Sequence, residues 1–107
     1  MNTYQDKIQL EDAIVGVLKT VYDPEIPVDI YALGLIYKID IDDEWNVNVD
    51  MTLTAPNCPV ADSILMEVRD KIGFIQGVKT AVVNLTFDPR WDKSMMSEEA
   101  QLELGFL

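Results

Sequence analysis

A single cysteine, placed where two sequence patterns meet, is the strongest candidate for chemistry in this 107-residue chain. Residues 52–62 read Thr-Leu-Thr-Ala-Pro-Asn-Cys-Pro-Val-Ala-Asp, and the apolar residues change from strand-like to helical spacing at Pro59. Proline is tolerated at the first position of a helix, so Cys58 is the expected N-cap residue. Free backbone N–H groups and the helix dipole would then favour the thiolate, the form that attacks electrophiles and binds metals.

A carboxylate that follows this thiol in the sequence would instead disfavour the thiolate. Asp62 follows Cys58 by one helical turn, where a close negative charge would raise the pKa of the thiol. No arginine lies nearby in the sequence to stabilise the thiolate. A cysteine is also more often a small buried hydrophobe than a reactive group, so a purely structural role for Cys58 is kept as an alternative.

The absence of histidine restricts what the thiol can do. It excludes a Cys-His catalytic pair and imidazole metal ligands, and a single cysteine excludes an internal disulfide. An iron–sulfur cluster needs about four protein ligands, usually thiolates. Two interpretations therefore stay open: a one-cysteine redox site, or a cluster completed by a second copy, by carboxylates or by another protein.

The elements before the cysteine segment are a helix, a long loop and a hairpin. The helix is predicted from Asp6, capped with Gln9 as a partner, to near Tyr22, because Pro24 disfavours helical geometry before it. The loop 23–34 holds two prolines and three carboxylates, and a connection of this length is more often functional.

Alternating apolar residues predict two hairpin strands at 35–41 and 45–54, joined by an acidic turn. Odd-numbered side chains, Tyr37 among them, are expected on the apolar face, and Ile36 on the polar face. The second helix is predicted from Pro59 to Gly73. A third strand follows at 80–88. The sequence leaves the strand order open, but if the third strand pairs with the second, the helix between them makes the two parallel, with a right-handed crossover.

The C-terminal residues predict a short helix capped by Ser97, which ends near Leu104 and packs through Leu102 and Phe106. The element order is thus α-β-β-α-β-α. This order predicts a two-layer α+β fold in which a small three-stranded sheet is covered by helices on one face. We expect a single domain over residues 1–107, with 90–107 as a docked tail helix.

The charge of the chain bears on its partners. With 19 acidic and 8 basic residues, the net charge is −11, which makes nucleic acid and membrane surfaces unfavourable partners. The acidity could serve solubility or could steer a basic protein partner. The N-terminus does not resemble a signal peptide, and no apolar run approaches the roughly 20 residues that span a bilayer, so the expected location is the cytoplasm. A homodimer is an open alternative.

Three segments in order resemble the SufT/PaaD-type family of metal-sulfur cluster assembly proteins, and specifically its single-domain SUF-type branch. The first is residues 23–37, which contain Asp-Pro-Glu-Ile-Pro-Val-Asp-Ile and Leu-Gly-Leu-Ile-Tyr. The second is Thr-Leu-Thr-Ala-Pro-Asn-Cys-Pro at 52–59, and the third is Val-Asn-Leu-Thr-Phe-Asp-Pro-Arg-Trp at 83–91.

The resemblance implies a fold related to the C-terminal domain of NifU-like proteins, and a non-enzymatic role in delivering or maturing iron–sulfur clusters in client proteins. It implies that Cys58 is a metal or cluster ligand, or a transfer thiol. The cargo would be a transient iron–sulfur cluster or iron that one chain does not hold stably. Partners would be iron–sulfur assembly proteins and client apoproteins. The supporting site residues would be Asp23, Glu25, Thr52, Thr54, Asn57 and Asp62.

One position departs from the family pattern. The family often has glycine immediately before the cysteine, where this chain has Asn57. Asparagine tolerates a left-handed backbone better than most residues, so the shape of the loop can be kept. Two other functions stay open beside the resemblance: a small one-cysteine thiol redox protein and an acidic protein-interaction module.

Overall fold

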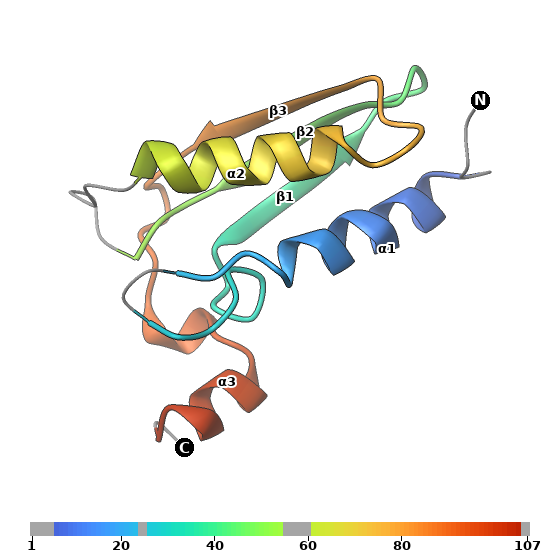
Figure 1. The fold of residues 1–107 in the computed structure, drawn as a ribbon. Helices are drawn as coiled ribbons and strands as arrows, with labels where there is room; N and C mark the ends of the chain where they lie inside the picture. Colours follow the sequence, from blue (N-terminus) through green and yellow to red (C-terminus); the bar gives the residue numbers. More distant parts are fainter. Residues whose placement is uncertain (1–5, 24–25, 55–60, 106–107) are drawn as a thin grey trace.

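A computed structural model describes residues 6–23, 26–54 and 61–105, without the side chains of residues 61 and 62. Helices α1 and α2 lie on one face of the sheet, and α3 lies beyond its end (Figure 1). No helix in these ranges is long and apolar enough to cross a membrane. The predicted α+β order is confirmed, with α1 (Lys7–Leu18), β1 (Ile36–Ile41), β2 (Asn46–Met51), α2 (Ala61–Gly73), β3 (Thr80–Leu85) and α3 (Glu98–Glu103).

The third strand pairs with the second, an order that the sequence left open, and the two are parallel as expected for that pairing. The strand order of the sheet is β1-β2-β3, with β1 antiparallel and β3 parallel to β2, so α2 forms the crossover between the parallel strands. The central strand β2 buries Val47, Val49 and Met51, which face the helices. This period of two in a half-buried strand is what the sequence showed. The parallel pairing matters for function because it brings the ends of β2 and β3 to the same edge of the molecule.

Strand β1 differs from its prediction at Tyr37. A register shift between Ile36 and Lys38 aligns Ile36 with the buried Met51, and Ile36 packs against the core. The hydroxyl of Tyr37 instead donates to the carbonyl of Pro89 at 2.8 Å. The predicted faces of Ile36 and Tyr37 were therefore wrong, because the irregularity changes which side chains face the core at the beginning of β1, whereas Ile39 and Ile41 keep the predicted face.

The end of α1 also differs from its prediction. The helix ends at Leu18 rather than near Tyr22. The reason lies in the following loop, where the N–H of Ile30 donates to the carbonyl of Val21 at 2.8 Å and Tyr22 pairs with Asp29 in an isolated antiparallel bridge. The backbone after Leu18 thus has extended partners that are incompatible with another helical turn.

Of the three predicted N-caps, Asp6 and Ser97 lie among the described residues and both form, whereas Cys58 lies outside them. The carboxylate of Asp6 accepts from the N–H of Gln9 at 2.8 Å, and the hydroxyl of Ser97 accepts from the N–H of Ala100 at 3.1 Å. The predicted packing of Leu102 was wrong, since this side chain is 62% exposed. Helix α3 has only six residues, and its buried side is that of Ala100.

The segment after β3 is tied to the loop between α1 and β1. The indole N–H of Trp91 donates to the carbonyl of Leu33 at 2.6 Å, and the N–H of Ser97 donates to the carbonyl of Ala32 at 2.8 Å. Met96 is buried with the core residues. This segment therefore crosses the end of the sheet at which β2 finishes.

Candidate functional site

The segment that carries the cysteine connects β2 to α2, and Thr54 is the last described residue before it. Because the side chains of residues 61 and 62 are not described, Thr54, four residues before Cys58, carries the described side chain nearest to the thiol along the chain. Several predicted residues, or their side chains, lie outside the described residues: Glu25, Asn57, Cys58, Asp62 and Phe106.

A hollow of about 110 Å³ lies beside Thr54. It is bounded by the end of β2 and by the segment after β3, and its lining consists of Leu53, Thr54, Phe87, Arg90 and Trp91. The parallel pairing of β2 with β3 brings these two segments together. The structure thus adds an arginine and two aromatic residues to the predicted neighbourhood of Thr54.

Arg90 supplies positive charge to this hollow. Its side chain is exposed and forms no ion pair among the described residues. A guanidinium is always charged and binds anionic groups through several N–H donors. In a chain with a net charge of −11 it is one of only eight basic residues. The hollow can therefore attract an anion such as a thiolate, a sulfide or a carboxylate.

The predicted site residue Thr52 lies at the end of β2 and is fully buried. Its N–H donates to the carbonyl of Leu35 at 2.8 Å, but its hydroxyl has no hydrogen-bond partner within residues 6–23, 26–54 and 61–105. A buried hydroxyl without a partner costs free energy. A group of this kind in a native protein calls for a structural or functional explanation.

Thr52→Val is expected to leave the free energy of unfolding unchanged or to raise it by about 1 kcal/mol, because valine matches the shape of threonine and removes the unpaired hydroxyl. Urea denaturation followed by circular dichroism measures this change. Thr54→Val, at a half-buried position of the same segment, is the matched control. A loss of stability in Thr52→Val of more than about 1 kcal/mol would show that the hydroxyl does have a stabilising partner.

The predicted site residue Asp23 holds the backbone of its own loop. It is only 7% exposed, and its carboxylate accepts a hydrogen bond from the N–H of Ile26 at 2.9 Å. Asp29, in the same loop, accepts from the N–H of Ala32 at 2.9 Å. Neither carboxylate lines the hollow at Thr54. Among the described residues, no three histidine, cysteine or acidic side chains converge in a way that could hold a metal ion.

The comparisons with known proteins cover most of the chain. Residues 11–84 match the family model described as iron-sulfur cluster assembly protein. A protein of Porphyromonas gingivalis called Fe-S protein maturation auxiliary factor is 59% identical over 94% of this chain and 95% of its own length. The Fe-S protein maturation auxiliary factor SufT of Staphylococcus aureus is 42% identical over 79% of this chain and 97% of its own length.

A solved structure supports the same relationship. A domain of unknown function, DUF59, from Bacillus anthracis superposes with a TM-score of 0.86 at 34% sequence identity, over 94% of this chain and 95% of that one. The architecture in Figure 1 is therefore one that occurs in an experimentally determined relative.

Proposed function

This chain belongs to the iron-sulfur cluster assembly protein family, and on that basis we propose that it is an accessory factor that delivers or matures iron–sulfur clusters in client proteins. The observation that carries the proposal is the match over residues 11–84, which includes the cysteine segment and the loop before β1. Relatives that match it over nearly their full length are named maturation auxiliary factors.

We assign Cys58 as the residue that binds the cargo, an iron–sulfur cluster. This residue carries the only thiol of the chain, and a cluster usually requires about four ligands. One chain therefore supplies part of a ligand set, and the client apoprotein or an assembly protein supplies the rest. An incomplete set suits transfer, because the cluster leaves when the client offers more thiolates than the carrier does.

Arg90 is the residue we assign to attraction of the cargo. Thiolate-bound clusters and sulfide are anionic, and the net charge of −11 would repel them from most of the surface. A guanidinium in the hollow beside Thr54 offsets this repulsion locally. The hydroxyl of Thr52, which has no hydrogen-bond partner among the described residues, is a further donor near the same strand end. The proposed site thus combines a thiol with donors from two neighbouring segments.

Anaerobic reconstitution of an apo-dehydratase that requires a [4Fe–4S] cluster tests this function. We expect the wild-type chain to raise the initial rate at which the client gains activity, and Arg90→Gln to reduce that gain several-fold. Lys93→Gln removes the same charge from an exposed position that does not line the hollow, and it should retain the wild-type rate. An equal effect of the two variants would remove Arg90 from the site, and no acceleration by the wild-type chain would contradict the function itself.

A small thiol redox protein is the second candidate, and Arg90 is the observation that favours it, because a guanidinium close to a thiol lowers its pKa. The rate of alkylation of Cys58 as a function of pH separates the two functions. A thiol pKa near or above about 8.5, together with slow oxidation by peroxide, removes the redox candidate.

A further inference from the structure

The two edge strands of the sheet are protected to different degrees from pairing with a further strand. The β1 edge carries the irregularity at Tyr37 and the charged residues Lys38 and Asp40. The β3 edge reads Thr-Ala-Val-Val-Asn-Leu, without charge or proline, and keeps an uninterrupted register with β2. Natural proteins block open strand edges with charges, prolines and bulges. Strand β3 has none of these features and is therefore able to pair with another strand.

The backbone of β3 presents hydrogen-bonding groups at its outer edge. The N–H of Thr86 donates to the carbonyl of Met51 in β2 at 2.9 Å. Because backbone groups alternate between the two edges of a strand, the N–H groups of Ala81, Val83 and Leu85 face outward. No described segment pairs with them, since β3 ends the sheet. This edge can accept an extended chain.

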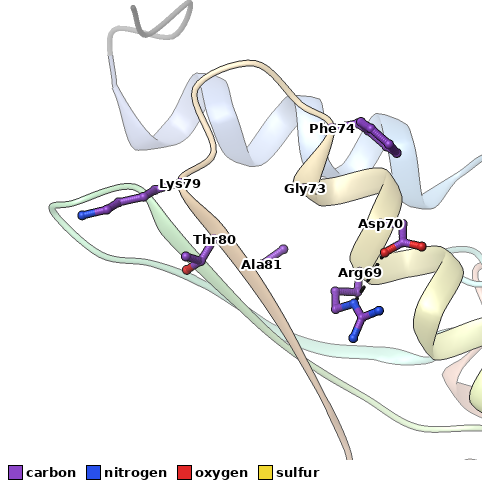
Figure 2. Close-up of a pocket in the computed structure, with 7 residues that line it drawn as sticks. All are labelled: Arg69, Asp70, Gly73, Phe74, Lys79, Thr80 and Ala81. Atoms are coloured by element: carbon purple, nitrogen blue, oxygen red, sulfur yellow. Dashed lines mark ion pairs between the residues drawn. The ribbon is translucent and has the colours of Figure 1, made fainter.

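A hollow lies next to the beginning of this edge, between the end of α2 and the start of β3 (Figure 2). Its volume is about 490 Å³. Gly73 and Ala81 leave the space open because they carry little or no side chain. Phe74 stands at the rim and is 87% exposed. A side chain from a strand added beside Ala81 would enter this hollow and cover apolar surface.

Two basic residues lie at the same place. Arg69 and Lys79 both line the hollow, together with Asp70, although the chain as a whole is strongly acidic. The Nε atom of Arg69 lies 3.5 Å from Oδ1 of Asp70, and the Nζ atom of Lys79 lies 3.6 Å from Oε2 of Glu44. The side chains of both pairs are well exposed. Exposed pairs of this kind contribute little to stability, so carboxylates from a partner can replace these contacts.

From these observations we propose that the open edge of β3 and the adjacent hollow bind an extended segment of a partner protein that carries apolar and acidic side chains. Main-chain hydrogen bonds to β3 supply affinity, and the hollow with its two cations supplies selectivity. A second copy of this chain fits less well, because its own β3 brings no carboxylate to the two cations. This surface is separate from the hollow at Thr54, since it lies at the start of β3 whereas Thr54 follows the end of the parallel strand β2.

Amide hydrogen exchange of the full ¹⁵N-labelled chain tests the proposal. The probe is a capped heptapeptide of alternating valine and glutamate, and the charge-reversed control is the same peptide with lysine in place of glutamate. In the free chain, the N–H groups of Ala81, Val83 and Leu85 should exchange rapidly. At saturating concentration of the acidic probe we expect their exchange to slow at least tenfold, with no such effect of the basic probe.

Variants of matched charge test the selectivity. Arg69→Gln and Lys79→Gln should each weaken binding of the acidic probe at least threefold, whereas Lys38→Gln, which removes a charge at the β1 edge, should not. Absence of protection at millimolar acidic probe, or protection confined to β1, overturns the proposal. Protection of β3 that depends on the concentration of the chain alone, with a doubled mass in sedimentation, assigns the edge to a second copy and also overturns it.

Discussion

Gly34→Ala is expected to lower the free energy of unfolding by about 3 kcal/mol, the sum of a left-handed backbone penalty and a steric clash. Gly34 has φ +80°, a conformation that side chains disfavour. A Cβ at this position would lie 2.8 Å from the carbonyl carbon of Met95 and closer still to its oxygen. The contact is between two backbone segments, so neither can move aside by a simple rotation of a side chain.

Urea denaturation measures this effect, and Gly16→Ala is the matched control. Gly16 lies inside α1 with no atom within 4 Å of an added Cβ, so alanine should raise stability by up to about 1 kcal/mol through its helix propensity. The clash should also detach the segment after β3, with loss of the hydrogen bond from Ser97 to Ala32. Equal stabilities of the two variants would contradict this account of how the segment packs.

Trp91→Ala is expected to lower the free energy of unfolding by about 3 kcal/mol. This value is at the lower end of the range for large-to-small aromatic substitutions, because Trp91 is only half-buried. Its indole packs against the core and donates to the carbonyl of Leu33 at 2.6 Å. The substitution removes both the apolar contacts and the donor. It also removes one side of the hollow at Thr54, so client maturation should fall even at temperatures where the variant stays folded.

Phe74→Ala is the control for Trp91, because it truncates an aromatic side chain that is 87% exposed. Its effect on the free energy of unfolding should stay within about 0.5 kcal/mol. Thermal and urea unfolding of both variants, read by circular dichroism, give the comparison. A cost for Trp91→Ala that is no larger than that for Phe74→Ala would show that the indole does not hold the segment.

The parts of the fold that depend on local patterns were predictable from the sequence. The alternation from Val47 to Met51 predicted the buried face of β2, and Asp6 and Ser97 were identified as N-caps. In each case the physical cause lies within a few residues, either in the period of two of a strand or in a side chain that accepts from a nearby N–H. The parallel direction of β3 followed from the intervening helix, given that β3 pairs with β2.

The parts that depend on distant contacts were not predictable in this way. The register shift at Tyr37 places its hydroxyl on Pro89, a residue far along the chain, and no local pattern signals it. Likewise, the early end of α1 reflects the pairing of Val21 with Ile30. The exposure of Leu102 follows from how little of the short α3 is covered.

Part of the candidate site was likewise predictable from the sequence, and part of it was not. The resemblance to the family motif drew attention to Thr52 and Thr54, and the structure places both just after the end of β2. Arg90 was missed because it is remote from them in sequence and reaches the hollow only through the parallel β2–β3 pair. The signal was present in the segment Asp-Pro-Arg-Trp after the third strand, but its meaning depends on the strand order.

The central claim is that this chain matures client clusters through its only thiol. The most direct test is the initial rate of client activation in anaerobic reconstitution with the wild-type chain, with Cys58→Ser and without any chain. We expect Cys58→Ser to unfold at the same urea concentration as the wild-type chain, and to give only the rate observed without any chain. Ser63→Ala, an exposed substitution in α2, should retain the wild-type rate. Client activation by Cys58→Ser at the wild-type rate would contradict the claim.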